Sequence, residues 1–393
     1  MFATLRKPRN PLLRIGALLS AAWLAACQPM ASGGSNGGQT IDTGAPVPVA
    51  LLVPSGSGNS GDETLAASLK QAAELAISDL EGVKIDLRVY STAGNAGKAA
   101  EMASKAVDDG AKIILGPVFA EEANAAAVAV ASRDVNVLSF SNNTDIAGGN
   151  LFVLGLTFPN TANRLASYAV SQGKKRVMIV NEQTTAGEIG ARAIQAAVSR
   201  SGGQIVGTAT YPFSQQGVVD AVPGIAARVK AGDVDALFMT ARTAGALPLL
   251  TQLLPEQGVD PAKTKFLGLT RWDIPTATLS LPGTQGGWFA LPDPALNQQF
   301  QSRFQAAFGA APHSIAGLSY DGIAAIGALV KSGNQNALTR SALTQGAGFV
   351  GVNGIFRLRP DGTNERGLAI AEVRAGQAVV IDPAPRSFGG AGF

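Results

Sequence analysis

Short apolar runs alternate with longer segments of helical period along the first half of this chain. The apolar runs predict strands at four places: Val47–Val53, Lys84–Tyr90, Lys112–Leu115 and Val135–Phe140. Between them, apolar positions recur every three or four residues and predict helices at Ser60–Leu80, Ala96–Asp109 and Glu121–Ser132. The first helix begins with a capping-box pattern, Ser60 and Glu63. This order is typical of a parallel sheet covered by helices on both faces.

A second series of the same kind begins near residue 160. It predicts strands at Arg176–Val180, Gln204–Tyr211, Val234–Met239 and Lys265–Leu269, and helices at Thr185–Ser201, Gly217–Lys230 and Gly245–Leu254. Three helical segments follow, at Pro294–Phe308, Ile315–Val330 and Leu338–Thr344. The last stretch is β-rich, with turns at Asn353-Gly354 and Asp361-Gly362. The repeated pattern predicts an α/β protein of two similar lobes, since the chain is too long for one ordinary core.

A glycine pattern follows the first predicted strand in VALLVPSGSGNSGDETLAASL, residues 49–69. Glycines 56, 58 and 61 match G-x-G-x-x-G, the fingerprint of a dinucleotide-binding turn. That site needs an acidic residue at the end of the second strand, where this chain has Tyr90-Ser91-Thr92. We therefore predict a turn at the mouth of a ligand cleft, without a nicotinamide or any other cofactor.

The N-terminus has the pattern of a secretory signal. A basic region contains Arg6, Lys7, Arg9 and Arg14 and precedes a short apolar run, Ile15–Ala26. The run ends in Leu24-Ala25-Ala26-Cys27, which resembles a bacterial lipobox and predicts lipidation of Cys27. The alternative is an ordinary signal with a chance cysteine. Residues 27–46 are rich in Gly, Ser and Pro and predict a flexible tether.

Charge and residue usage exclude several classes of function. The chain has 31 Lys and Arg against 28 Asp and Glu, and four of the basic residues lie in the signal, which leaves 27 against 28. That balance gives no support for nucleic-acid binding. Cys27 and His313 are the only cysteine and histidine. Zinc sites and Ser-His-Asp or Cys-His catalysis are therefore not expected, and we predict a non-enzymatic protein without a bound metal.

Polar clusters follow several predicted strands. In a doubly wound sheet, these carboxyl ends face the ligand crevice. The candidate ligand-binding residues are Ser55, Gly56, Ser57, Ser141, Asn142, Asn143, Thr144, Arg242, Arg271, Trp272 and Asp273. The triplet Arg271-Trp272-Asp273 places an aromatic ring between opposite charges, which suits a carboxylate or a partner surface. The alternative for the Ser, Asn and Thr residues is turn and helix-cap chemistry.

The segments ILGPVFAEEANAAAVAVASRDVNVLSFSN, GKKRVMIV and AGLSYDGIAAIGAL resemble periplasmic binding proteins of the leucine/isoleucine/valine-binding type. That resemblance implies two Rossmann-like doubly wound parallel-sheet lobes, joined by three crossover segments with a hinge and a central cleft. We place the crossovers near Thr157–Asn160, Ala290–Asp293 and Gly348–Gly354. The resulting organisation is a signal peptide at 1–26, a tether at 27–46, lobe I at 47–158 plus 291–347, and lobe II at 159–290 plus 348–393.

Two functional classes share this resemblance. Amino-acid receptors of ABC transporters place small hydroxyl residues after the third strand to hold the ligand carboxylate, where this chain has Gly116–Glu121. The segments VALLVPSG, GPVFAEEANA and FVLGLTFPNTANRLASYAVSQGKK resemble the lipoprotein activators of penicillin-binding proteins more closely. We therefore predict a lipid-anchored activator whose partner is a peptidoglycan synthase.

The predicted location is the periplasmic side of the outer membrane, because Gln28 rather than Asp follows the cysteine. The first alternative is an amino-acid receptor with a small ligand and an ABC permease. The second is a sensor of cell-wall fragments that reports to a partner.

Overall fold

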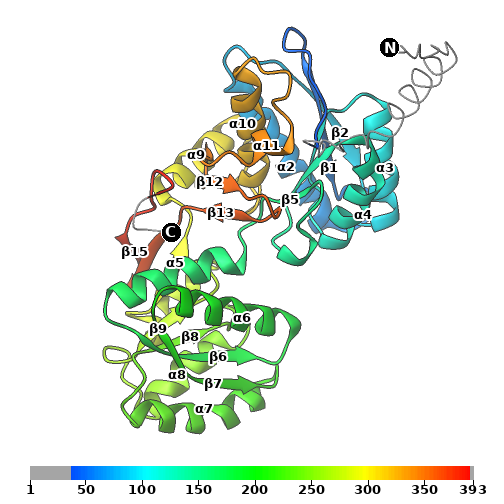
Figure 1. Cartoon of the computed structure of the whole chain (residues 1–393). Helices are drawn as coiled ribbons and strands as arrows, with labels where there is room; N and C mark the ends of the chain where they lie inside the picture. The colour runs from blue at the N-terminus through cyan, green and yellow to red at the C-terminus, as the bar shows by residue number, and fades with distance from the viewer. Residues whose placement is uncertain (1–36, 390–393) are drawn as a thin grey trace, which may run out of the picture. The chain divides into compact units, whose positions relative to one another are not determined.

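Two sheets with helices on both faces organise residues 37–389, the part of the chain that this computed structural model describes (Figure 1). The predicted signal peptide and the first half of the tether, Cys27 included, lie outside the described residues. The first sheet is wholly parallel and has the order β2-β1-β3-β4-β5. Its strands are β1 (Val47–Val53), β2 (Ile85–Ser91), β3 (Ile113–Leu115), β4 (Asn136–Ser139) and β5 (Leu151–Val153).

The second sheet has the order β15-β14-β10-β9-β8-β6-β7. In it, β14 pairs antiparallel with β10, and β15 pairs antiparallel with β14. Its strands are β6 (Arg176–Glu182), β7 (Gln204–Tyr211), β8 (Ala236–Met239), β9 (Lys265–Gly268), β10 (Trp288–Leu291), β14 (Ala369–Arg374) and β15 (Gln377–Asp382). A small antiparallel sheet contains β11 (Phe349–Gly351), β12 (Gly354–Leu358) and β13 (Asn364–Arg366). The predicted α/β class with parallel sheets is confirmed.

The helices fall into two groups. Those whose buried residues pack with the first sheet or with one another beside it are α2 (Ser60–Ser78), α3 (Ala96–Asp108), α4 (Ala120–Val130), α9 (Pro294–Phe308), α10 (Gly317–Lys331) and α11 (Arg340–Leu343). Those that cover the second sheet are α5 (Phe158–Ser171), α6 (Thr185–Arg200), α7 (Gln215–Lys230) and α8 (Leu247–Glu256). Short 3-10 turns are η2 (Ala131–Arg133), η3 (Thr144–Ile146), η4 (Thr276–Ser280) and η5 (Pro282–Thr284). Within residues 37–389, none of the helices combines the length and hydropathy needed to cross a membrane.

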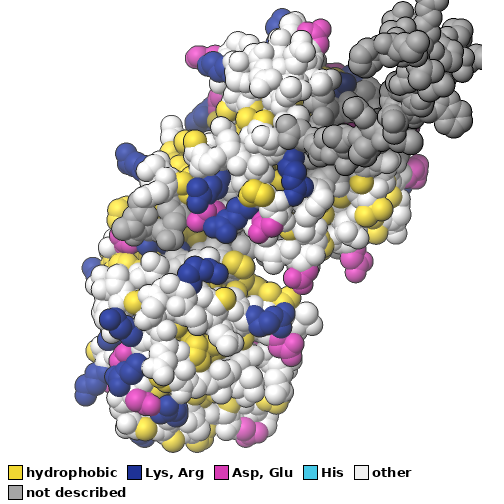
Figure 2. All heavy atoms as spheres, viewed as in Figure 1, with side chains coloured by type: hydrophobic (Ala, Val, Ile, Leu, Met, Phe, Trp, Pro, Cys, Tyr) yellow, Lys and Arg dark blue, Asp and Glu magenta, His cyan; other side chains and the backbone are white. Residues whose placement is uncertain are grey.

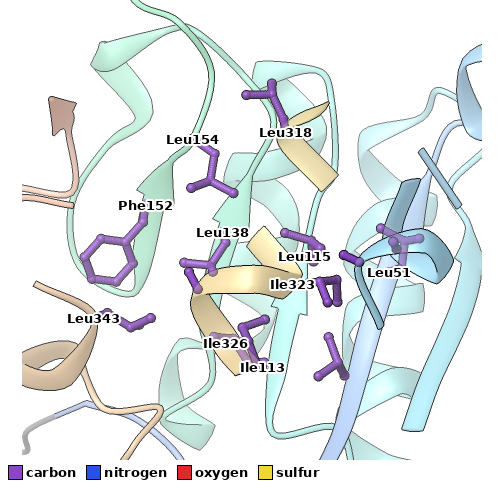
Figure 3. Close-up of a cluster of buried hydrophobic side chains, with 14 of the residues drawn as sticks. Leu51, Ile113, Leu115, Leu138, Phe152, Leu154, Leu318, Ile323, Ile326 and Leu343 are labelled. Atoms are coloured by element: carbon purple, nitrogen blue, oxygen red, sulfur yellow. The ribbon is translucent and has the colours of Figure 1, made fainter. Parts of the chain in front are cut away.

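Side-chain alternation along β1 divides the first core into two layers. Leu51 packs with Leu115 and with Ile323 and Ile326 of α10, and Figure 3 shows these side chains converging on one face of the sheet. Leu52, the next residue, packs on the other face among the small side chains of α3 and α4. The period of two therefore buries both faces, which explains why this strand is an unbroken apolar run.

The second core repeats this arrangement. Met178 and Val180 of β6 pack against α7 and α8, whereas Val177 and Ile179 pack against α5 and α6. Polar caps set where two of the helices begin: Thr184 accepts from the backbone of α6, and Ser214 accepts from that of α7.

The start of the first helix differs from the prediction. Asn59, not Ser60, is the N-cap, and its Oδ1 accepts from the Gly61 amide at 2.8 Å. The Glu63 side chain turns away from the helix start and accepts from the Gly56 amide at 2.6 Å. The capping-box prediction is wrong because the preceding glycine loop brings a competing donor to Glu63.

The chain passes between the sheets three times. The first two passages follow β5 and β10, close to the predicted crossovers. The third lies between β13 and β14, later than predicted, because Phe349 and Phe356 pack in the first core and only β14 joins the larger sheet. The lobe limits given above stay a prediction. Three elements that the sequence analysis omitted also appear: β5, α5 and β10.

Candidate ligand-binding site

A cavity of about 180 Å³ lies where the three passages between the sheets come together. Leu156 comes from the first passage, Pro292 from the second and Leu368 from the third. We call it the crossover cavity. Its complete lining is Leu156, Arg271, Ile274, Pro292, Ser314, Ile315, Leu318, Asn353, Arg366 and Leu368. The lining is therefore mostly apolar, with four polar side chains.

Arg271 and Asp273 form an ion pair beside this cavity. The Arg271 Nε lies 2.9 Å from Asp273 Oδ1, and its Nη2 lies 2.5 Å from Oδ2. The two side chains are 26% and 17% exposed. This two-point contact fixes the guanidinium plane. Arg271 lines the cavity, whereas Asp273 is not among the lining residues and reaches the site through its contact with Arg271.

A second ion pair, Arg366 with Asp321, is buried at the same place. Arg366 Nη1 lies 3.0 Å from Asp321 Oδ2, and Arg366 also donates to the Leu154 carbonyl. The carboxylate accepts from the Val352 amide at 2.8 Å and from Asn353 Nδ2 at 3.3 Å. Burial raises the pKa of Asp321, while Arg366 and the other donors lower it. The pair thus connects α10, the first passage, the β11–β12 turn and β13.

Polar groups of the predicted glycine loop form hydrogen bonds with other residues of the chain. Besides the contact of Gly56 with Glu63, the Ser57 hydroxyl donates to Asp62 Oδ2 at 2.8 Å. Ser55 Oγ lies 2.6 Å from the Ser91 hydroxyl. Carboxylates therefore stand where a dinucleotide would place its pyrophosphate, which argues against a nucleotide cradle.

The polar residues after β4 make turn contacts. Asn143 Oδ1 accepts from the Asp145 amide at 2.9 Å and caps η3, while the Ser141 hydroxyl accepts from the Asn143 amide. Asn142 is exposed, and Thr144 lines a different, larger cavity. The alternative reading of these residues as turn and cap chemistry accounts for Ser141 and Asn143.

The residues after β8 and β9 divide between surface and core. Arg242 is 56% exposed, 3.6 Å from Glu182 and 5.7 Å above the Phe213 ring. Trp272 is fully buried and stacks on Phe289 at 6.2 Å. An added Cβ at Gly268 would lie 2.1 Å from its indole. Trp272 therefore presents no ring face to a ligand, because its backbone turns it into the core between Arg271 and Asp273.

Glu122 was missed by sequence reasoning. It is buried in the first turn of α4, where Thr92 Oγ1 donates to Glu122 Oε1 at 3.0 Å. Its Oε2 has no hydrogen-bond partner in the described chain, and burial raises its pKa. Glu121, the acid noted after the third strand, is exposed, whereas its neighbour Glu122 places a buried carboxyl at this end of the first sheet, which disfavours a ligand carboxylate there.

The pair of Arg366 and Asp321, with Ser314 and Asn353, was also missed. One signal was available: Asp321 interrupts an apolar helical segment, and a buried carboxylate normally has a partner. Across residues 37–389, no group of three or more His, Cys, Asp or Glu side chains could hold a metal ion.

Comparisons with known proteins agree with this architecture. The model of a family described as "Periplasmic binding protein" matches residues 46–378. A search of curated proteins found no match. Among solved structures, an ABC transporter substrate-binding protein from Desulfitobacterium hafniense in complex with Leu is 18% identical, with a TM-score of 0.63, covering 86% of this chain and 100% of that one.

Two further structures are similar. A branched-chain amino acid ABC transporter periplasmic ligand-binding protein from Burkholderia xenovorans is 19% identical, with a TM-score of 0.67, covering 86% of this chain and 94% of that one. A solute-binding protein from Rhodopseudomonas palustris, in complex with 3,4-dihydroxybenzoic acid, is 19% identical, with a TM-score of 0.57 and coverages of 87% and 97%. At these identities the likeness shows the fold alone.

Proposed function

This chain belongs to the periplasmic binding protein family, and from that premise we propose that it is a solute receptor that binds an apolar α-amino acid in the crossover cavity. This is the alternative from the sequence analysis, in which an ABC permease receives the ligand. The family implies a periplasmic location. Lipidation at Cys27 and anchoring to the outer membrane remain part of the proposal.

The observation that carries this function is the ion pair of Arg271 and Asp273 beside an apolar lining. An α-amino acid carries a carboxylate and an ammonium one carbon apart. A guanidinium and a carboxylate held side by side match that pattern, since each attracts one ligand charge. Leu156, Ile315 and Leu318 offer contact to an aliphatic side chain.

The position of the cavity supports a receptor that changes arrangement on binding. Its lining draws on all three passages between the sheets, so a bound ligand contacts the segments about which the lobes can move. A ligand that contacts one arrangement better than another shifts the population toward it. The relatives solved with Leu and with an aromatic acid support a small ligand of about this size.

Thermal unfolding of the full chain in detergent micelles tests the proposal. The panel is L-leucine, L-isoleucine, L-valine and benzoate, which lacks the ammonium. A ligand at 100 times its dissociation constant stabilises the fold by about 2.7 kcal/mol. We expect that shift for an aliphatic amino acid and its loss in Arg271→Gln, with Arg133→Gln as the matched surface control.

Two outcomes would contradict the proposal. Benzoate binding without any amino-acid binding would assign a simple anion to the cavity. A chain that ignores the whole panel but binds and stimulates a peptidoglycan synthase would return the assignment to the penicillin-binding protein activator. The buried Glu122 counts against a ligand carboxylate at the end of the first sheet, but it is not part of the crossover-cavity lining.

A further inference from the structure

A cavity of about 690 Å³ lies between helices α5 and α6 and the strands β12 and β13. It shares only Arg366 with the crossover cavity. We call it the basic cavity, because five arginines line it: Arg164, Arg200, Arg357, Arg359 and Arg366. Figure 2 shows Lys and Arg side chains gathered over β12 and β13.

Positive charge exceeds negative charge around this cavity. Glu365 is the one carboxylate in its lining. Its Oε2 lies 2.7 Å from Arg357 Nε and 3.0 Å from Arg359 Nη2, so one carboxylate pairs with two guanidinium groups. Arg200 donates to the side-chain amide oxygen of Asn163, a neutral partner. An anion that enters the cavity therefore meets guanidinium groups whose charge is only partly neutralised.

The two deepest arginines are balanced separately. Arg164 pairs with Asp382 at 2.6 Å, and Arg366 pairs with Asp321 at 3.0 Å. Asp361 lies on the turn beyond Arg359 and is close enough to interact with it. The pairs of Arg164 and Arg366 hold these two buried arginines in place. Arg200 and Arg359 are exposed and within reach of a ligand, and of the two only Arg359 has carboxylate neighbours in the part of the chain that the structure describes.

Asn364 adds a buried hydrogen-bond acceptor to the lining. Only 6% of the residue is exposed, and its Nδ2 donates to the carbonyls of Val153 at 2.7 Å and Gly155 at 2.8 Å. Because both amide hydrogens are used, Oδ1 is fixed as an acceptor. It has no donor within residues 37–389. Almost none of the Oδ1 surface is exposed, so a ligand donor reaches this acceptor only when the lining side chains move, and a bare anion has no donor to supply.

We propose that the basic cavity binds a phosphorylated sugar. The phosphate would lie against Arg200 and Arg359, since guanidinium groups match phosphate oxygens with paired N–H bonds. A sugar hydroxyl would donate to Asn364 Oδ1. The ligand comes either free or as the phosphorylated sugar head of an envelope lipid, and both present the same chemistry. This site is separate from amino-acid binding and does not depend on it.

Isothermal titration of the full chain in detergent micelles tests the site. The probes are glucose 6-phosphate, glucose and inorganic phosphate, followed by lipid A dissolved in the same detergent. We expect glucose 6-phosphate to bind more tightly than glucose or phosphate, and its affinity to fall as salt is raised. Tighter binding of lipid A would identify the lipid head as the source, and binding of glucose 6-phosphate alone would identify the free sugar phosphate.

The variants Arg200→Gln and Arg359→Gln each remove one charged donor and should weaken binding by about tenfold. Arg133→Gln, an exposed arginine beside the first sheet, is the matched control and should bind as the parent does. Circular dichroism checks that each variant is folded, and L-leucine binding should be unchanged in all three. Absence of binding to every probe, or equal weakening in Arg133→Gln, would overturn the proposal.

Discussion

Two arginine–aspartate pairs occupy the crossover cavity region, and they differ in depth. Arg366 and Asp321 are 4% and 0% exposed, whereas Arg271 and Asp273 are 26% and 17% exposed. The buried pair also has partners in two further segments: the Leu154 carbonyl in one, and the Val352 amide and the Asn353 side-chain amide in the other. Within residues 37–389, the side chains of the partly exposed pair, Arg271 and Asp273, hydrogen-bond only to each other.

This difference in burial suggests different roles. We call Arg366 and Asp321 the structural joint, and we call Arg271 and Asp273 the recognition pair. Removing one partner from a buried pair leaves an uncompensated charge in a dry site, so the chain depends on both Arg366 and Asp321. A partly exposed pair contributes little to stability and can exchange one partner for a ligand group. We therefore expect the former pair to act as the structural joint and, under the proposed function, the latter pair to select the ligand.

The largest expected effect is on the joint. Arg366→Leu leaves Asp321 buried without its cation and should lower the free energy of unfolding by about 3–5 kcal/mol. Urea denaturation followed by circular dichroism measures this. The double variant Asp321→Asn with Arg366→Leu removes the stranded charge and should recover part of the loss. A single variant within about 1 kcal/mol of the parent would place Asp321 outside this joint.

The second prediction concerns recognition. Arg271→Gln should weaken the best-bound amino acid by about 10- to 150-fold, the effect of losing a charged hydrogen bond. Its free energy of unfolding should change by about 1 kcal/mol or less. Isothermal titration and urea denaturation of the same sample give both values. A large stability loss without an affinity loss would make this pair a second structural joint.

Asp273→Asn sharpens the same comparison from the other side. It removes the negative charge expected to attract the ligand ammonium, while benzoate has no ammonium to lose. The ratio of amino-acid to benzoate affinity should fall by about tenfold. Competition titration measures the ratio, and an unchanged ratio would show that Asp273 only orients Arg271.

The effect of Glu122 depends on pH. Burial raises the folded pKa of this carboxyl above its ordinary value of 4.5, so the folded state holds the proton more tightly than the unfolded state. Its stabilising contribution is present below the unfolded pKa and is lost as pH rises through the folded pKa. Glu122→Gln should therefore gain stability relative to the parent as pH rises from 4 to 7. Thermal unfolding across that range would reveal a constant difference if the carboxyl were unperturbed.

Arg242 should show the smallest effect on ligand binding, because it is largely exposed and is not part of the crossover-cavity lining. Arg242→Ala should leave amino-acid affinity unchanged, although it lowers stability by removing the cation nearest the buried Glu182. Titration against Arg271→Gln provides the comparison. Equal losses in the two variants would place the ligand at the edge of the second sheet and not in the crossover cavity.

The alternating sheets were predictable because strand and helix periods are local. The unbroken apolar run around Leu51 and Leu52 is enough to predict a strand that is buried on both faces. Three-residue β5 is too short for any period to register, and α5 begins at a passage between the sheets where the sequence analysis placed a crossover. The later third passage depends on where Phe349 and Phe356 pack, which their local sequence does not encode.

The site was less predictable, since its chemistry comes from distant pairs. Arg366 and Asp321 are 45 positions apart, and no local pattern joins them. Arg271 and Asp273 could be named as candidates because both follow one predicted strand, and the structure pairs them with each other. The error on Trp272 has a clear cause: Gly268 leaves room for its ring in the core, and only the tertiary packing shows that the ring occupies it.

The burial of Trp272 gives the protein a built-in optical probe. Its indole is shielded from water, so its emission should lie toward shorter wavelengths than that of an exposed tryptophan. Peptide bonds connect it directly to Arg271 and Asp273, the residues expected to grip the ligand. In a variant with Trp23→Phe and Trp288→Phe, Trp272 is the only tryptophan left in the sequence, so its fluorescence would follow ligand occupancy in real time without an added label.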